Sequence, residues 1–351
     1  MHKNILITGG AGFIGSNIAV YLKKRYPKAN IIALDNLKRR GSELNIKRLK
    51  DEKVSFLHGD IRCREDLSLG KKIGLIIECS AEPSVLADIT MSPEYVINTN
   101  LIGTINCLEL ARKEKADFIF LSTSRVYPYE RIADLKVKEN KSRLVWRKNQ
   151  KHTGFSARGI DTDFPLQGPK SLYGATKLSC ELLLAEYIKN YQIRGIINRC
   201  GVIAGPWQFG KVDQGVFSLW MKHHYFKRPL SYIGWGGKGK QVRDLLHIDD
   251  LCELLGMQIS NMTKGNGKIY NVGGGEKVSL SLLETTALCE QITGNKIKID
   301  SRTKNRPFDM PVYITNNKKI NCDYNWQPKR SREKVLKDIY EWLKQIEKDW
   351  V

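Results

Sequence analysis

Near the start of the chain, a short apolar strand runs into a helix through three glycines that are each separated by two residues. The strand covers residues 4–7, and the glycines are Gly9, Gly12 and Gly15. Gly9 permits a tight turn, Gly12 lets the backbone approach a pyrophosphate, and Gly15 lets the helix pack against the strand. Because a helix N-terminus directs free N–H groups toward an anion, the pattern predicts a phosphate-binding turn. The residues expected to bind there are Gly9, Gly12, Phe13, Ile14 and Gly15.

An acidic residue ends the second apolar strand. Residues 31–34 are apolar, and Asp35 follows them, twenty residues after Gly15. A carboxylate at that distance accepts hydrogen bonds from the adenosine ribose and repels a 2′-phosphate, which favours NAD over NADP. A glycine-rich turn without a ligand is the alternative for the triplet alone. The strand, the glycines and the acid together favour dinucleotide binding.

The composition restricts the class of protein. The chain has 351 residues, of which 41% are hydrophobic, and no run reaches the roughly 18 to 20 apolar residues that span a bilayer. A strand begins within the first few residues, so no signal peptide and no membrane partner are expected. The eight cysteines are scattered without metal-ligand spacing, which predicts reduced thiols in the cytoplasm and no metal site. The net charge of +21 is spread along the chain, so it favours an anionic small substrate over nucleic acid.

Apolar strands alternate with helical patterns through the first two hundred residues. This alternation predicts an α/β fold with a doubly wound parallel sheet of the Rossmann type. Ligands of such sheets bind beyond the carboxyl ends of the strands, where Asp35, Asp60, Ala81 and Ser122 lie. We expect a dinucleotide-binding domain over residues 1–200 and a smaller mixed α/β substrate lobe, partly interleaved with it, over residues 201–351.

Three side chains could together form a site for proton transfer. Tyr173 and Lys177 are four residues apart in a predicted helix over residues 171–191, so they share one helix face. A neighbouring ammonium favours the phenolate, which makes Tyr173 a usable base near neutral pH. Thr123, at the end of a predicted strand, could hold the substrate oxygen. The same tyrosine–lysine spacing recurs at Tyr340 and lacks a preceding strand-end hydroxyl, so there we expect an ordinary packed helix.

These motifs resemble those of the extended short-chain dehydrogenases/reductases, in the group of nucleotide-sugar epimerases and dehydratases. The resemblance runs nearly end to end. It implies a bound NAD that is not consumed, a nucleoside-diphosphate sugar as substrate, and a homodimer paired through the helices at 93–113 and 171–191. The segments that carry it are the glycine triplet, Asp60-Ile61, Asn100, Tyr173 with Lys177, Gly205-Pro206, residues 241–244 and residues 272–274.

The resemblance also implies roles for individual residues. The catalytic residues would be Thr123, Tyr173 and Lys177. The cofactor would contact Gly9, Gly12, Phe13, Ile14, Gly15, Asp35, Asn36, Arg39, Asp60, Ile61, Ser80, Ala81, Asn100, Ser122, Tyr173 and Lys177. The substrate would contact Ser84, Thr123, Ser124, Arg125, Arg199, Gln208, Gln214, Arg243 and Arg306, with Arg243 and Arg306 on the diphosphate.

The chain departs from this pattern in three places. Dehydratases of the group carry Asp-Glu directly after the catalytic threonine, whereas this chain has Ser124 and Arg125, which favours epimerisation over loss of water. Glu78 stands where relatives often carry histidine. A basic insertion over about 128–164 could be a solvated loop, a lid over an anionic substrate or a surface for a charged polymer.

Other functions stay open at this point. A 4-epimerase would need almost the same residues as any other epimerase of the group. A 4,6-dehydratase or a reductase would give a dehydrated product or consume added cofactor. A fold relative that binds polyanions would need none of the three catalytic side chains.

Overall fold

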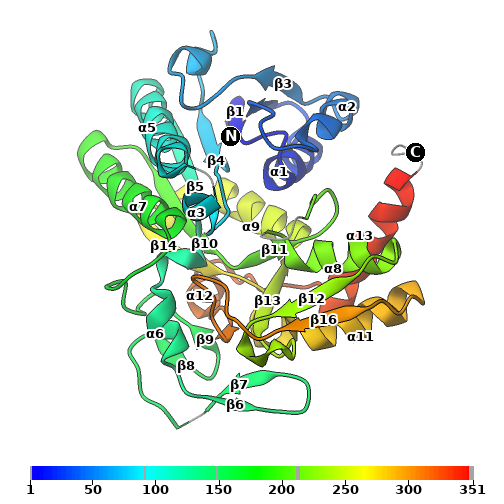
Figure 1. The fold of residues 1–351 in the computed structure, drawn as a ribbon. Coiled ribbons are helices and arrows are strands. Elements are labelled where there is room, and N and C mark those ends of the chain that lie inside the picture. Colours follow the sequence, from blue (N-terminus) through cyan, green and yellow to red (C-terminus); the bar gives the residue numbers. More distant parts are fainter. Residues whose placement is uncertain (1, 91, 148, 211–213, 348–351) are drawn as a thin grey trace.

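A parallel sheet of seven strands forms the centre of the described part of the chain (Figure 1). The structure, a computed structural model, describes residues 2–90, 92–147, 149–210 and 214–347. Across the sheet the strands follow the order β14-β10-β5-β4-β1-β2-β3, and every pairing is parallel. This order confirms the doubly wound Rossmann-type fold. The strands are β1(Asn4–Thr8), β2(Asn30–Asp35), β3(Ser55–His58), β4(Leu75–Glu78), β5(Asp117–Thr123), β10(Gly195–Cys200) and β14(Lys268–Val272).

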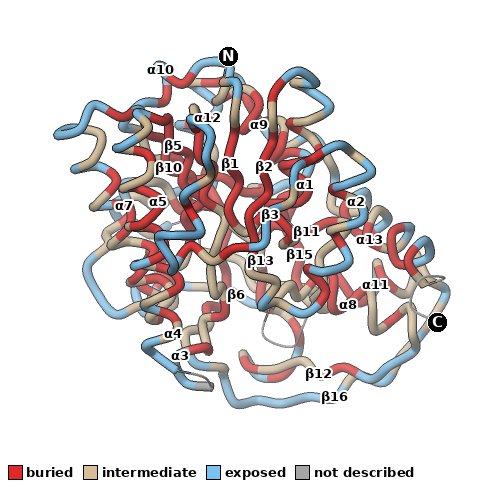
Figure 2. Tube along the Cα trace, turned by 90° about the horizontal axis from the view of Figure 1, so that it is seen from above, coloured by how far each residue is buried: buried red, intermediate tan, exposed pale blue. Residues whose placement is uncertain are grey.

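Helices cover both faces of this sheet. Successive strand side chains point to opposite faces, so Ile5 and Ile7 of β1 pack in a different core cluster from Leu6. The first cluster includes α1(Phe13–Arg25) and α9(Ile248–Ser260), and the second includes α5(Gly103–Glu114) and α7(Leu172–Tyr191). The buried strands between these layers appear in red in Figure 2. Because both faces are covered, the inner strands β1, β2, β4 and β5 are buried along almost their whole length, whereas the edge strand β3 is largely exposed.

The helix expected near residue 93 is interrupted. It consists of α4(Pro93–Ile97), a π-helical turn η3(Asn98–Ile102) and α5. π-helical turns occur frequently at functional sites, and this one carries Asn100. The remaining helices around the sheet are α2(Asn45–Asp51), α3(Ala87–Thr90), α10(Met262–Gly265) and α12(Lys318–Tyr324). None of the helices in the described part of the chain combines the length and apolar character that a membrane-spanning segment needs.

A second, smaller lobe lies beside the carboxyl end of the sheet (Figure 1). The chain enters this lobe after β10, returns to the first for α9 and β14, and then leaves again. Its strand pairings are both parallel and antiparallel, as expected for a mixed α/β lobe. Its elements are β11(Val202–Ala204), α8(Val216–Tyr225), β12(Leu230–Ile233), β13(Val242–His247), β15(Ser279–Ser281), α11(Leu282–Thr293), β16(Ile299–Arg302), β17(Val312–Tyr313) and α13(Arg332–Glu347).

The basic insertion is folded onto the second lobe. Arg143 forms an ion pair with Glu284 at the start of α11, and the backbone of Ile160 exchanges hydrogen bonds with Ile314 and Asn316. Trp146 adds apolar contact with the strands of this lobe. No described residue of 131–158 lines the cavity described below, so the structure does not place the insertion as a lid. Its elements are α6(Tyr129–Ala133), β6(Val137–Glu139), β7(Leu144–Trp146), β8(Phe155–Ser156) and β9(Gly159–Ile160).

Candidate active site

The glycine turn between β1 and α1 has the shape of a phosphate cradle. Gly9 has φ +61°, and a Cβ added at Gly15 would lie 2.2 Å from the Gly9 carbonyl oxygen, so neither position accepts a side chain without a backbone shift. Gly12 begins the helix with no side-chain cap, and the first turn holds no acidic residue. The first-turn N–H groups therefore stay available to an anion, and the turn fits a dinucleotide pyrophosphate.

Two carboxylates lie at neighbouring strand ends of the cofactor half. Asp35 ends β2 and accepts hydrogen bonds from the N–H of Ala11 (3.1 Å) and of Leu37 (2.8 Å). Burial raises the pKa of Asp35 despite these bonds. Burial has the same tendency at Asp60, but hydrogen bonds from Arg62 and Asn36 outweigh it and lower the pKa to about 2. Both groups line the cavity as acceptors, which fits a ligand with ribose hydroxyls.

The three expected catalytic residues come together in the structure. Thr123 ends β5, Tyr173 lies in the first turn of α7, and Lys177 lies one turn later on the same face. Burial raises the pKa of Tyr173, while the Lys177 ammonium and a hydrogen bond with the Thr123 hydroxyl oppose that rise. All three line one cavity, so the arrangement can take a proton from a bound hydroxyl.

A buried carboxylate accompanies the catalytic lysine. Lys177 Nζ lies 3.4 Å from Glu78 Oε2 and 4.0 Å from the centre of the Phe120 ring, and both charged side chains are at most 2% exposed. The Thr8 hydroxyl donates a hydrogen bond to the other Glu78 oxygen (3.5 Å). The Glu78 charge raises the pKa of Lys177 against the opposing effect of burial. This ion pair gives the departure at Glu78 a physical role, because a buried lysine keeps its charge best beside a carboxylate.

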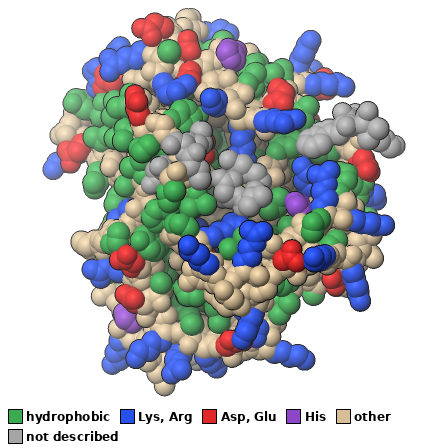
Figure 3. Space-filling model, in the orientation of Figure 1, with side chains coloured by type: hydrophobic (Ala, Val, Ile, Leu, Met, Phe, Trp, Pro, Cys, Tyr) green, Lys and Arg blue, Asp and Glu red, His purple; other side chains and the backbone are tan. Residues whose placement is uncertain are grey.

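The cavity between the two lobes has a volume of about 1580 Å³ and is open to solvent. Lys and Arg side chains gather around the hollow between the lobes (Figure 3). Most of the residues expected from sequence line it, from both lobes. These are Gly9, Gly12, Phe13, Ile14, Gly15, Asp35, Asn36, Arg39, Asp60, Ile61, Ser80, Ala81, Ser122, Thr123, Ser124, Arg125, Tyr173, Lys177, Gln208, Gln214, Arg243 and Arg306.

Three expected residues, Ser84, Asn100 and Arg199, do not line the cavity. The Asn100 amide accepts a hydrogen bond from the Glu82 N–H (2.8 Å) and donates one to the Glu82 carbonyl oxygen (3.1 Å). It also donates to Thr176 Oγ1 (3.3 Å). It therefore fixes the segment after β4 that carries the cavity residues Ser80 and Ala81. The Ser84 hydroxyl accepts a hydrogen bond from the Leu86 N–H (3.2 Å).

The structure does not bring Arg199, which was expected to bind substrate, to the cavity. Its guanidinium is 2% exposed and forms a forked ion pair with Glu181 of α7, whose shortest distance is 2.7 Å. It also donates to the Tyr127 hydroxyl (3.1 Å), which in turn donates to Asn271 (2.7 Å). Because its partners Glu181 and Tyr127 are both protein groups inside the core, this side chain joins α7 to the sheet.

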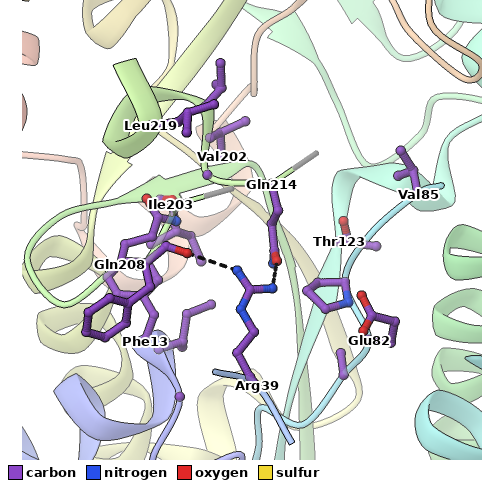
Figure 4. A pocket seen from close by; sticks show the side chains of 18 of the residues that line it. Phe13, Arg39, Glu82, Val85, Thr123, Val202, Ile203, Gln208, Gln214 and Leu219 are labelled. Carbon is purple, nitrogen blue, oxygen red and sulfur yellow. Dashed lines mark hydrogen bonds between the residues drawn. The ribbon is translucent and has the colours of Figure 1, made fainter. Parts of the chain in front are cut away.

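Arg39 bridges the two lobes across the cavity (Figure 4). From the segment after β2, its guanidinium binds the Gln214 side chain and the Phe209 carbonyl oxygen (3.1 Å) of the second lobe. Gln208, in the same part of the second lobe, donates to the Ile203 carbonyl oxygen (3.0 Å) and accepts from Ser218 (2.5 Å). The expected cofactor residue Arg39 and the expected substrate residue Gln214 therefore meet at one point.

Sequence reasoning missed several basic residues of the cavity. They come from the segment after β2, from α8 and from β16, and no motif marks them. Their only signal is the clustering of lysines and arginines in each segment. They are Lys38, Arg40, Lys222 and Arg302. No group of three or more His, Cys, Asp or Glu that could hold a metal ion occurs in the described ranges.

Comparisons with known proteins show the family of the chain. The family model "NAD dependent epimerase/dehydratase family" matches residues 5–273. CDP-paratose 2-epimerase from Salmonella typhi is 30% identical over 356 residues, which cover 97% of this chain and 99% of the relative.

Solved structures give the same picture. UDP-glucose 4-epimerase from Thermotoga maritima with UDP-glucose is 25% identical with a TM-score of 0.79. The match covers 97% of this chain and 99% of the epimerase chain. dTDP-glucose 4,6-dehydratase from Bacillus anthracis in complex with NAD is 27% identical with a TM-score of 0.76, and the coverages are 99% and 98%. The chain therefore belongs to the NAD dependent epimerase/dehydratase family of extended short-chain dehydrogenases/reductases, and NAD is its cofactor.

Proposed function

We propose that this chain epimerises a nucleoside-diphosphate sugar through a transient ketosugar and retains its NAD throughout. The observation that carries this proposal is the set of Thr123, Tyr173 and Lys177 in one cavity, followed directly by Ser124 and Arg125. A hydroxyl and a guanidinium do not supply the acid–base pair that eliminates water. Oxidation and re-reduction of one carbon need only the three catalytic side chains and the cofactor.

The chain's own groups handle the proton and the substrate oxygen. Tyr173, as phenolate, takes the proton of the sugar hydroxyl and later returns it, while Thr123 holds that oxygen in place. Lys177 keeps its charge beside Glu78 and stabilises the phenolate. NAD, which the glycine turn, Asp35 and Asp60 would hold, would supply the hydride acceptor and donor for oxidation and re-reduction of the sugar carbon. The cavity of about 1580 Å³ leaves room for the ketosugar to turn between the two transfers.

The substrate follows from the relatives and from the charge of the cavity. A diphosphate would be held by Arg243 and Arg306, because guanidinium groups bind phosphate oxygens in pairs. The similarity to CDP-paratose 2-epimerase supports a CDP-sugar that is inverted at C2. A UDP-sugar 4-epimerase is the second candidate, supported by the fold similarity to UDP-glucose 4-epimerase.

Two further properties belong to the proposal. A homodimer would pair through the α4–α5 and α7 helices, because the apolar residues Ile102 and Leu182 are 41% and 65% exposed there. A cytoplasmic location fits the eight cysteines, which are all free thiols.

The first test is to denature the purified protein and measure the released dinucleotide. About one NAD+ or NADH per chain supports a self-contained epimerase, and CDP-, UDP- and GDP-sugars are then screened without added cofactor. Tyr173→Phe should lower turnover by about 10²- to 10⁴-fold, because it removes the proton acceptor. The mechanism is wrong if this variant turns over near the wild-type rate, and failure to bind even added NAD+ would refute the catalytic function itself.

A further inference from the structure

Arg125 has a fixed place beside the reacting groups. It lies two residues after Thr123, and its N–H donates a hydrogen bond to the Thr123 hydroxyl oxygen (3.2 Å). A Cβ added to Gly174 would lie 2.1 Å from the Arg125 carbonyl oxygen, so the Arg125 backbone lies directly against the first turn of α7. Tyr173 belongs to that turn, and its negative charge as phenolate acts to raise the pKa of Arg125. Arg125 therefore lines the cavity at the end where the reacting groups lie.

The Arg125 guanidinium has few partners. It carries five N–H donors, and within the described ranges its one hydrogen bond goes from Nη1 to the Phe308 carbonyl oxygen (2.9 Å). No carboxylate of the described residues forms a salt bridge with it. The residue itself lines the cavity, so a bound ligand can come into contact with it. A buried guanidinium is usually compensated by a carboxylate, and Arg125 has no carboxylate partner of its own among the described residues.

The neighbouring charges increase this imbalance. The Arg243 guanidinium is close enough to repel it, and burial together with this repulsion lowers the pKa of Arg125 to about 10. Asp309 is the nearby carboxylate, but it accepts hydrogen bonds from Arg243 (2.6 Å) and from the Trp235 ring N–H (3.0 Å). One carboxylate thus faces two guanidinium groups, and a bound anion would restore the balance.

The diphosphate of the substrate already has other arginines. Arg243, Arg302 and Arg306 come from the second lobe, whereas Arg125 comes from the end of β5 beside the proton-transferring groups. A ligand group at Arg125 is therefore a group on the sugar ring. Carboxylates match the planar donor fork of arginine, whereas a neutral hydroxyl would leave the charge unbalanced.

We propose that Arg125 binds a carboxylate of the sugar ring, so that the preferred substrates of this enzyme are nucleoside-diphosphate sugars with an acidic sugar, such as hexuronates. This inference rests on the proposed function, because it needs a nucleotide sugar in the cavity. It adds no chemical step. The guanidinium recognises and orients the ring, and Thr123 and Tyr173 still transfer the proton.

The experiment measures binding to the NAD-loaded protein by calorimetry, with UDP, UDP-glucose and UDP-glucuronate as probes. The two sugars share base and diphosphate, so the ratio of their affinities does not depend on the base that the enzyme prefers. We expect UDP-glucuronate to bind about 10- to 100-fold more tightly than UDP-glucose, the range of one to two charge-assisted hydrogen bonds. Arg125→Met should reduce that ratio to near one and leave UDP binding unchanged, and Arg125→Lys should keep part of the preference.

Arg306→Met is the matched control, because it removes another cavity arginine and should weaken all three probes in proportion. Unchanged UDP binding also shows that Arg125→Met is folded. A wild-type ratio near one overturns the proposal, and so does a loss of UDP affinity in Arg125→Met as large as the loss for UDP-glucuronate. If UDP, CDP, GDP and their sugars all fail to bind, the proposed function fails instead.

Discussion

Replacing Arg199 with methionine tests whether this residue supports the fold or binds substrate. Arg199 and Glu181 are both 2% exposed, and the guanidinium approaches the carboxylate at 3.1, 3.0 and 2.7 Å. The substitution leaves Glu181 buried, and among the described residues the Ser122 hydroxyl is then its remaining side-chain partner. Removing one member of a buried ion pair destabilises a protein by about 3–5 kcal/mol. We expect the free energy of unfolding of Arg199→Met to fall by that amount.

The assay is urea unfolding followed by tryptophan fluorescence, with UDP affinity measured separately. The double variant Arg199→Met/Glu181→Met removes both charges and should recover most of the loss, because replacing a whole buried pair by apolar side chains is often near neutral. Together with the single variant Glu181→Met, these two variants complete a double-mutant cycle that gives the coupling energy of the pair. A loss in Arg199→Met below about 1 kcal/mol together with a tenfold weaker UDP affinity would refute the structural role and return Arg199 to the substrate site.

Two further predictions concern the cofactor turn and the subunit contact. Gly15→Ala should abolish NAD retention, because the added methyl group would lie 2.2 Å from the Gly9 carbonyl oxygen; released dinucleotide measures this, and retention at the wild-type level would contradict it. Gly70→Ala is the control: its methyl group meets nothing within 4 Å, so it should keep NAD, although the φ of +61° at this position costs some stability. Leu182→Glu should convert the expected dimer to monomers in light scattering, because a charge would be buried at the contact. Leu57→Glu on β3 (wild-type exposure 38%) should leave the mass unchanged, and a dimer that persists in Leu182→Glu would disprove the proposed contact.

The central fold could be predicted because each piece carries a local signal. The strands at 4–7 and 31–34 are apolar runs, and the structure places β1 and β2 over them. The glycine turn follows from spacing alone, since a side chain at Gly15 has no room. Thr123, Tyr173 and Lys177 meet because strand ends and the first turn of the next helix converge in this fold.

The direction of the Arg199 side chain could not be predicted from sequence, because residue spacing does not show that its partner is Glu181. Asn198 binds Gln258 of α9 on one face of the sheet, so the next residue of β10 points to the other face, toward Glu181 of α7. The period of the strand gives this alternation, but a charged residue near a strand end also fits a ligand site. The contact between Arg143 and Glu284 spans 141 positions, so the place of the insertion could not be predicted from sequence.

The late position of β14 in the chain has a consequence for how this protein is made. The strand that completes the central sheet beside β10 is residues 268–272, more than sixty positions after β10 ends. While the ribosome still holds those residues, the fully buried strand β10 is an unpaired sheet edge. Such an edge invites pairing with another nascent chain. A fragment that stops near residue 200 would keep this edge permanently and should aggregate, so the cofactor half cannot be produced as an independent piece.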